Sequence, residues 1–393
     1  MPTEGARKGA RDRAWSWRGA WLAVIGTFAL TLLGGTAAAG PGWTVVPAPS
    51  SGATNDQLAA DACVLAPVKL CKAVGYSGAT TAAPQHTFVL SSSGGGWIRN
   101  PSPNVLSGDA LTGVSCVTST FCKAVGYYFD GTYDQPLIIA WSRGWARNPS
   151  PPLGAGTNEL LGVSCASVKL CFAVGETTIG TGPQRTLIEE WNGSAWHHVT
   201  SPSPGGAPDV LNGVSCASVT LCKAVGTSGH PGQTTTLIES FNGHTWSLQA
   251  SPNGGNGENV LYGVACAPKA AVCKAVGYDL YYGGAQPLIE SWRGAAWAIE
   301  PSVTTGGYPT YLTGDACPTA KSCRAVGYTL GGGTSRTFIE GWTGATWVMQ
   351  TSPNRGSGEN SLDAIACFSA AACRAAGDWA GSLGDHSLLE SQG

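Results

Sequence analysis

The fourteen cysteines are the residues whose spacing most clearly indicates chemistry, because they form seven close pairs. The members of a pair stand six to eight positions apart, and the second member recurs every 49 to 51 residues. Thiolates can bind zinc, but one pair per repeat leaves the pairs too far apart to share a tetrahedral site. A disulfide closing so short a loop contributes roughly 2 kcal/mol in the chain-entropy model. We predict seven local disulfides: Cys63–Cys71, Cys116–Cys122, Cys165–Cys171, Cys216–Cys222, Cys266–Cys273, Cys317–Cys323 and Cys367–Cys373.

A second chemical pattern combines aromatic rings with carboxylates in two segments, "YYFDGTYDQP" (127–136) and "YDLYYGGAQP" (278–287). Tyrosine rings beside carboxylates suit the stacking of sugar rings or contact with a protein partner. The alternative is that these side chains pack against neighbouring loops. The candidate ligand-binding residues are Tyr127, Tyr128, Asp130, Tyr133, Asp134, Tyr278, Asp279, Tyr281 and Tyr282.

Motifs of known catalytic spacing do not accompany these residues. The six histidines form no HExxH pattern, and the sequence contains neither GxSxG nor a phosphate-binding loop. The cysteines are all assigned to structural pairs, which leaves no free thiol as a nucleophile. We therefore name no catalytic and no metal-binding residue, and a catalytic group assembled from distant repeats stays an open alternative.

The cysteine pairs belong to a repeated unit of about fifty residues. In one unit, "LNGVSC" and "CKAVG" are short apolar runs, "TLIESF" is rich in β-favouring residues, and "TWSLQA" follows a glycine-containing turn. Runs of four to six residues fit strands rather than helices. Four antiparallel strands per unit make one propeller blade, with the cysteines facing each other across the first hairpin. The sequence predicts an all-β, seven-bladed propeller.

Both ends of the repeated region carry incomplete units. The last unit stops after "SLLESQG", a third strand, whereas "GWTVVPAPS" (42–50) precedes the first unit and reads as a fourth strand. In a ring, this N-terminal strand completes the last blade and removes an open sheet edge. The connections between second and third strands, and between blades, are predicted to be long and to lie on one face, where variable loops usually bind ligands.

Two polar positions repeat from unit to unit. Two residues before the first leucine of the first strand, six of seven units have Asp or Asn, and the seventh has Thr310. We prefer a side-chain-to-backbone turn for this position. The alternative is a ring of ligands at the channel mouth, with calcium as a low-ranked cofactor. These residues are Asp56, Asp109, Asn158, Asp209, Asn259 and Asn360.

The second repeated polar position is a glutamate in the third strand, found in five units. In four of them the second strand offers Lys or Arg, so we predict cross-strand charge pairs. Glu189 is the exception, because Phe172 replaces its cation. The glutamates are Glu189, Glu239, Glu290, Glu340 and Glu390, and the cations are Lys223, Lys274, Arg324 and Arg374.

The consensus "L.GVSC.....C.AVG......TLIE.WNG..W" resembles the repeats of propellers related to the Asp-box and sortilin types and to photosystem II assembly factors. It is closer to those of uncharacterised secreted bacterial repeat proteins with "GVSC" and "WNG..W" phrases. The resemblance covers residues 42–390 and implies the propeller fold, not a function. An Asp box would have Asp five residues before the tryptophan, where this chain has Trp191, Phe241, Trp292 and Trp342.

The N-terminal region reads as a signal peptide over residues 1–39, with the propeller over residues 40–393. Basic residues precede an apolar stretch (20–33), and "GGTAAAG" offers small residues for cleavage after Ala39. An uncleaved membrane anchor is the alternative. Disulfides and a signal segment predict a secreted or extracellular protein.

The composition and the loops together give the functional hypothesis. Lys and Arg number 22 against 24 Asp and Glu, which argues against a nucleic-acid partner. We predict a noncatalytic, monomeric recognition protein for an extracellular glycan or protein, which contacts a membrane only if the signal segment stays uncleaved. The alternatives are a glycoside hydrolase or lyase that uses carboxylates on the loop face, and a structural protein of the cell envelope.

Overall fold

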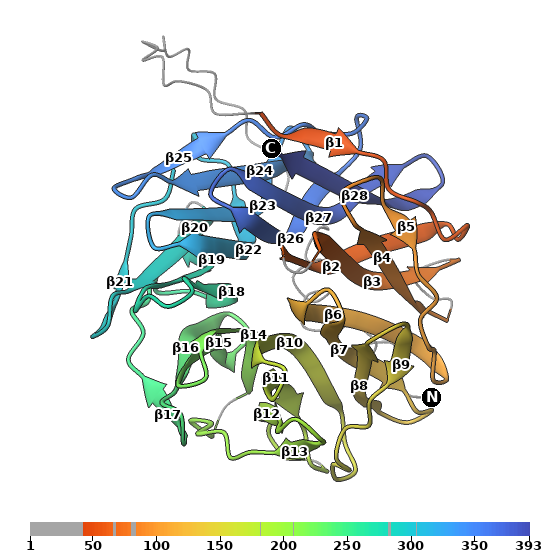
Figure 1. The fold of residues 1–393 in the computed structure, drawn as a ribbon. Coiled ribbons are helices and arrows are strands. Elements are labelled where there is room, and N and C mark those ends of the chain that lie inside the picture. The colour runs from red at the N-terminus through yellow and green to blue at the C-terminus, as the bar shows by residue number, and fades with distance from the viewer. Residues whose placement is uncertain are drawn as a thin grey trace. The chain divides into compact units, whose positions relative to one another are not determined.

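Seven four-stranded antiparallel sheets are arranged around a common axis and form a β-propeller (Figure 1). The structure is a computed structural model that describes residues 42–65, 68–79, 84–180, 182–206, 208–281, 284–303 and 305–393. Within these residues there is no helix, so the predicted all-β, seven-bladed fold is confirmed. The described part of the chain accordingly holds no helix that could cross a membrane. The predicted signal segment, residues 1–39, lies outside the described residues.

Each blade consists of four strands, which we letter A to D from the axis outwards. The A strands are β2 (Asn55–Val64), β6 (Ser107–Thr118), β10 (Asn158–Ser167), β14 (Asp209–Ser218), β18 (Asn259–Cys266), β22 (Thr310–Thr319) and β26 (Asn360–Ser369). The B strands are β3 (Leu70–Gly78), β7 (Phe121–Phe129), β11 (Leu170–Thr177), β15 (Leu221–His230), β19 (Cys273–Tyr281), β23 (Ser322–Gly331) and β27 (Ala372–Gly381). The C strands are β4 (His86–Ser92), β8 (Asp134–Trp141), β12 (Arg185–Trp191), β16 (Gln233–Phe241), β20 (Gly284–Trp292), β24 (Thr334–Trp342) and β28 (Gly384–Gln392). The D strands are β5 (Ile98–Arg99), β9 (Trp145–Arg147), β13 (Trp196–His198), β17 (Trp246–Gln249), β21 (Trp297–Ile299), β25 (Trp347–Gln350) and β1 (Thr44–Val46).

The hydrophobic cores lie between blades. Blade 1 begins with β2 and blade 7 with β26. In one core, Val125 and Ile138 of blade 2 pack with Leu160 and Leu187 of blade 3, and all four side chains are buried. B strands therefore have neighbours on both faces, which explains why "AVG" is a continuous apolar run rather than an alternating one.

The A strands of adjacent blades approach one another so closely that the position three residues before the first cysteine admits only small residues. A Cβ added to Gly113 would lie 3.1 Å from the Cα of Gly162 in the next blade. One added to Gly213 would lie 2.7 Å from the carbonyl oxygen of Tyr262. The structure thus explains why Gly or Ala stands three residues before the first cysteine in every unit.

The seven disulfides are confirmed, each within the A–B hairpin of one blade. In blade 2, for example, Cys116 lies directly opposite Cys122 in the register of β6 and β7. All fourteen cysteines are used, and none is free. Seven disulfides indicate an oxidising compartment.

The N-terminal strand closes the ring as predicted. β1 pairs antiparallel with β28, with Val45 opposite Glu390, and so becomes strand D of blade 7. Trp43 is buried, and its Nε1 donates a hydrogen bond of 2.9 Å to Oε1 of Gln350 in blade 6. The first and last strands of the chain therefore lie side by side (Figure 1).

The prediction that the B–C connections are long loops is wrong for most blades. β23 and β24 are joined through residues 332–333 alone, and β7 and β8 through 130–133. The strands extend to their tips because glycines with positive φ make the turns, as at Gly131 (φ 105°) and Gly333 (φ 85°). The two aromatic segments are consequently strand ends. The long connections are those from strand D to the next strand A, here called the D–A linkers.

Removal of β1 should open the ring. A protein comprising residues 47–393 would lose the buried Trp43 and expose the edge of β28, so we expect a melting temperature more than 5 °C lower and aggregation on heating. Trp43→Phe is the milder control, because it keeps β1 and removes the hydrogen bond to Gln350, worth about 1 kcal/mol, together with part of the buried indole ring. Differential scanning calorimetry and light scattering measure both. An unchanged melting temperature for the shortened protein would contradict closure by β1.

Candidate functional site

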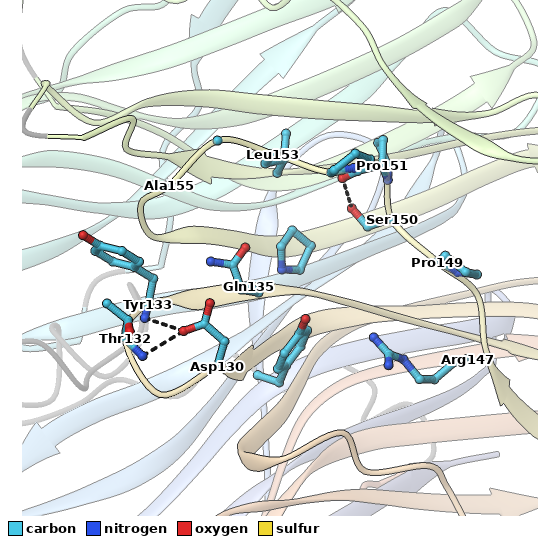
Figure 2. Close-up of a pocket in the computed structure, with 14 residues that line it drawn as sticks. Asp130, Thr132, Tyr133, Gln135, Arg147, Pro149, Ser150, Pro151, Leu153 and Ala155 are labelled. Atoms are coloured by element: carbon cyan, nitrogen blue, oxygen red, sulfur yellow. Dashed lines mark hydrogen bonds between the residues drawn. The ribbon is translucent and has the colours of Figure 1, made fainter.

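A pocket of about 550 Å³ lies between the end of blade 2 and the linker that leads to blade 3. One wall is the β7–β8 hairpin and the other is the D–A linker 148–157, with Arg147 and Pro149 at one end (Figure 2). The lining residues are Tyr128, Asp130, Thr132, Tyr133, Gln135, Pro136, Arg147, Pro149, Ser150, Pro151, Pro152, Leu153, Gly154 and Ala155. Three of the residues predicted to bind ligand, Tyr128, Asp130 and Tyr133, thus share one pocket.

The hairpin wall is shaped by Asp130. Its Oδ1 accepts hydrogen bonds of 2.8 Å from the backbone N–H groups of Thr132 and Tyr133 (Figure 2). These bonds fix the turn and hold Tyr133 at its tip, where the side chain is 37% exposed. Tyr128 lies deeper and is half-buried. The hairpin thus offers one exposed and one recessed aromatic ring.

The linker wall is rigid because several groups hold its backbone. Gln135 Nε2 donates to the carbonyl oxygen of Gly156 at 3.2 Å, and Asn158 Nδ2 donates to the same oxygen at 2.8 Å. Gly156 has a φ of 149°, and a Cβ there would collide with the Thr178 carbonyl. The proline doublet Pro151–Pro152 restricts the wall further. A ligand would therefore meet a preformed surface.

Opposite charges stand at the two ends of the pocket. The N–H groups of Tyr133 and Thr132 hold the pKa of Asp130 below its ordinary value, so the carboxylate is ionised at neutral pH. The Arg147 guanidinium is exposed, and its Cζ lies 5.7 Å from the centre of the Tyr128 ring. This distance is within the range of a cation–π contact. The pocket therefore combines apolar walls with one anion and one cation.

The other predicted ligand-binding residues lie elsewhere. Tyr127 is buried, and Asp134 pairs with Phe129 at the start of β8 outside the pocket. In blade 5, Tyr278 is also buried, and its hydroxyl donates a 3.0 Å hydrogen bond to Oε2 of Glu258. Its ring lies 5.0 Å from that of Tyr311 in blade 6. Tyr127 and Tyr278 are therefore packed side chains rather than exposed ones, although Tyr278 packs against a neighbouring blade and not against a loop, as the alternative interpretation supposed.

The tip of the blade 5 hairpin differs from its base. Tyr281 is 61% exposed at the end of β19. Burial raises the pKa of Asp279, which pairs with Gln286 in the sheet. Tyr282 lies outside the described residues. The structure thus does not bring the blade 5 segment to the pocket of blade 2.

The Asp and Asn side chains at the repeated position form hydrogen bonds with the backbone of the D–A linkers. Asp209 Oδ2 accepts from the N–H of Gly205 at 3.0 Å, and Asn259 Oδ1 accepts from the N–H of Gly254 at 2.8 Å. In the same way, the backbone N–H of Ser51 donates to Asp56 Oδ2, and that of Val105 donates to Asp109 Oδ2. Asn158 and Asn360 bind linker carbonyls with their amide groups. All six side chains are buried, as the turn interpretation requires. Among the described residues, no group of three or more His, Cys, Asp or Glu gathers to hold a metal ion.

The predicted cross-strand charge pairs are wrong. Lys223 lies opposite Ser240, whereas Glu239 lies opposite Ala224, so the two charged side chains point to opposite faces of the blade. The same one-residue offset separates Lys274 from Glu290, Arg324 from Glu340 and Arg374 from Glu390. Successive residues of a β-strand point to opposite faces, so an offset of one residue prevents these charged side chains from pairing. The sequence pattern alone did not give this register.

The glutamates instead bind serines of the preceding D–A linker. Ser201 Oγ lies 2.9 Å from both carboxyl oxygens of Glu239. Ser150, on the pocket wall, donates to Glu189 Oε1 at 2.6 Å. Equivalent contacts join Ser251 to Glu290, Ser302 to Glu340 and Ser352 to Glu390. Each buried glutamate therefore fastens its own blade to the linker that enters it.

The four B-strand lysines point to the next blade, where each meets a C-strand tryptophan, whereas Arg324 reaches Gln392 and the carbonyl oxygen of Ala370. Lys123 Nζ lies 3.5 Å from the centre of the Trp191 ring, and Lys223 Nζ lies 3.8 Å from that of Trp292. Lys223 also donates to Gln249 Oε1, which accepts a hydrogen bond from Trp297 Nε1 of the next blade. Buried cation–π contacts are worth about 2 kcal/mol.

The interface between blades 3 and 4 replaces this whole arrangement. Phe172 stands in place of the lysine and lies 4.7 Å from Phe241, which stands in place of the tryptophan. Val199 occupies the position of Gln249, and Nε1 of Trp246 is consequently without a hydrogen-bond partner. The Phe172 exception in the sequence therefore concerns this interface and not Glu189.

The sequence interpretation missed the second wall of the pocket. Gln135, Arg147 and the prolines of the linker line it together with the predicted tyrosines. The signal was the doublet Pro151–Pro152, which is found once in the chain, directly after a D strand. The assumption that the B–C tips alone carry the site left this linker out.

The comparisons with known proteins support the class of fold. No family model and no curated protein matches the chain. Among solved structures, it is similar to one titled "YCF48 bound to D1 peptide", with a TM-score of 0.54 and 12% identity over 90% of this chain and 99% of that one. It is also similar to the GH74 xyloglucanase of Xanthomonas campestris, with a TM-score of 0.54 and 12% identity over 86% of this chain and 53% of that one. The protein is a seven-bladed β-propeller.

The buried glutamates predict that the protein is more stable in mild acid. Burial raises the pKa of Glu189, Glu239 and Glu340 to about 7 and that of Glu290 and Glu390 to about 8. The folded state thus binds more protons than the unfolded state between their ordinary pKa and about 8, so stability is full below that interval and falls as pH rises through it. His198 opposes this trend, because burial lowers its pKa. Burial also lowers the pKa of Lys72, Lys123 and Lys223 to about 8, which acts only above that pH.

Thermal unfolding followed by circular dichroism tests this dependence. We expect a higher melting temperature at pH 5 than at pH 7.5, and a smaller difference in Glu239→Gln, because the amide cannot take up the proton. Glu190→Gln is the control, since this glutamate lies on the opposite face of β12 from the buried Glu189 and is 3.8 Å from His197. A melting temperature that rises with pH would contradict the prediction.

The exceptional interface predicts that three positions act as one unit. Phe172→Lys alone places an uncompensated charge against Phe241 and should cost more than about 2 kcal/mol. The triple variant Phe172→Lys, Val199→Gln, Phe241→Trp rebuilds the arrangement of the neighbouring interfaces, and we expect it to regain at least half of that loss. Urea unfolding gives both free energies. A triple variant no more stable than Phe172→Lys would contradict the prediction.

Proposed function

We propose that this propeller is a secreted, noncatalytic recognition protein that binds a glycan or a peptide segment in the pocket formed by Tyr128, Tyr133, Arg147 and the linker 149–155. The observation that carries the proposal is the meeting of two tyrosine rings, a proline-rich wall and two opposite charges in one preformed depression. Aromatic rings with a few fixed polar groups are the usual lining of such sites.

The neighbouring structures are consistent with either ligand class. One neighbour was solved with a bound peptide, and the other is a xyloglucanase, whose name denotes action on a glycan. The resemblance of the repeats to the photosystem II assembly-factor type agrees with the first. Both neighbours share only the fold at this identity, so the pocket carries the argument.

Binding is preferred to hydrolysis because of the carboxylates. Glycoside hydrolases use two carboxyl groups that flank the scissile bond. Asp130 is the one carboxylic acid among the lining residues, and one of its oxygens is engaged by two backbone N–H groups. Its lowered pKa also makes it a poor general acid at neutral pH. Hydrolysis would require a second acid from another part of the chain.

The extracellular location is proposed on two grounds. Seven disulfides persist in an oxidising compartment. The sequence of residues 1–39 has the basic, apolar and small-residue regions of a signal peptide. A surface-exposed recognition protein with few charged residues fits this setting.

Screening residues 40–393 on a glycan array and on a peptide array identifies the ligand class. Tyr128→Ala and Arg147→Ala should each weaken binding of the best ligand at least tenfold and shift the melting temperature by less than about 3 °C. Tyr308→Ala is the matched control, because this tyrosine is 55% exposed outside the pocket and should leave affinity unchanged. Equal affinities for all three variants would move the binding site away from this pocket.

A further inference from the structure

The two ends of the ring differ in their connections. The seven A–B turns and the six C–D turns lie together at one end, here called the turn face, because the strands of each blade are antiparallel. The pocket and the D–A linkers lie at the other end. The turn face consists of residues 65, 68–69, 119–120, 168–169, 219–220, 267–272, 320–321 and 370–371 of the A–B turns, with 93–97, 142–144, 192–195, 242–245, 293–296 and 343–346 of the C–D turns.

The charges of the turn face all have one sign. Its turns contain no Asp or Glu, although the whole chain has more acidic than basic residues. Exposed lysines stand on the A–B turns of four blades, and exposed arginines stand on two C–D turns. These residues are Lys69, Lys169, Lys269, Lys321, Arg143 and Arg293, of which Arg293 is paired with Glu300.

Further cations lie directly behind the turns. Lys72, Lys123, Lys223 and Lys274 each follow the second cysteine of their blade by one residue, and all four are buried. Lys274 forms an ion pair with Glu300, whereas the charge of the other three adds to the potential at this end, because fields of buried charges are less screened than those of exposed ones. The turn face is therefore positive over several blades.

Exposed aliphatic side chains stand beside the lysines. Val68 and Val168 precede Lys69 and Lys169 directly in the sequence, and Val219 occupies the same place in blade 4. Their exposed fractions are 55%, 43% and 49%, and Leu65 is 52% exposed. Valines exposed to solvent at hairpin tips bury no apolar surface and so contribute no hydrophobic stabilisation. Beside lysine, they match a bilayer interface, where the amine reaches phosphate and the aliphatic group enters the acyl boundary.

We propose that the turn face docks on the surface of an anionic lipid bilayer, with the turn lysines on headgroup phosphates and the valine and leucine tips at the interface. The path of the chain agrees with this orientation. β28 ends at the turn face and β1 begins there, since Thr44 lies opposite Ser391, so Gly42 also lies at this end. The pocket at the opposite end would then face away from the membrane.

Vesicle sedimentation tests the docking. The protein comprises residues 40–393, which include every strand and core cluster of the ring and exclude the apolar N-terminal stretch. We expect it to bind vesicles of 30% phosphatidylglycerol in phosphatidylcholine, to bind pure phosphatidylcholine at least tenfold more weakly, and to dissociate at high salt. Equal binding to both vesicles would overturn the proposal.

Two matched variants locate the contact. Lysines near an anionic surface contribute roughly fivefold each to partitioning, so Lys169→Ala with Lys321→Ala should weaken binding about 25-fold. Arg185→Ala with Arg355→Ala removes the same charge from exposed residues at the opposite end and should change binding less than threefold. Circular dichroism confirms that both variants are folded. Equal losses in the two variants would overturn the assignment to the turn face.

The aliphatic tips separate a bilayer from a soluble polyanion. Val168→Ser with Val219→Ser leaves all charges in place and should weaken vesicle binding at least fivefold, because the valines would no longer enter the interface. We expect polyphosphate in solution to compete poorly at equal phosphate concentration. Full competition by polyphosphate, with unchanged vesicle binding of the serine variant, would show that the face binds a soluble polyanion and overturn the lipid proposal.

Discussion

The protein has no core inside any blade, and this constraint governs the rest of the structure. Each hydrophobic cluster takes its residues from two adjacent blades, as Leu211 of blade 4 packs with Phe172 and Ile188 of blade 3. A blade is therefore stable only when both neighbouring blades are in place. The last blade in the ring, blade 7, is complete only when β1 supplies its strand D. The polar contacts follow the same rule, since the lysine–tryptophan contacts and the serine–glutamate contacts all join one blade to the next.

The repeated sequence positions make sense as interfaces and not as sites within a blade. Glu239, Lys223 and Asp209 belong to one unit, yet each binds a group that another blade or a linker provides. In blade 1 both members differ, since Leu90 stands in place of the glutamate and Ala48 in place of its serine. In blade 2 Ile139 replaces the glutamate, whereas Ser102 is kept and contacts the hydroxyl of Thr87. Equivalent positions in different units thus make their contacts with polar, aromatic or aliphatic side chains.

Strand number, blade number, closure and the disulfides were predictable, because repeat period and cysteine spacing are local properties of the sequence. The glutamate partners were not, because a one-residue offset between Lys223 and Glu239 decides which face each occupies. Only one of the two walls of the pocket was predicted. Tyr128, Asp130 and Tyr133 come from one contiguous segment, whereas Arg147 and the wall 149–155 reach it only through the path of the D–A linker.

The pairing of β1 with β28 also sets the order in which the protein can be completed. Each disulfide lies in a hairpin of one blade, so it can form as soon as that hairpin has been synthesised. Among the described strands, β1 is synthesised first and its partner β28 last. Through the whole of synthesis the segment around Trp43 stays without its sheet, and blade 1 stays without a preceding neighbour. Seven hairpins can thus be cross-linked independently of one another, whereas the ring closes only when β1 pairs with β28.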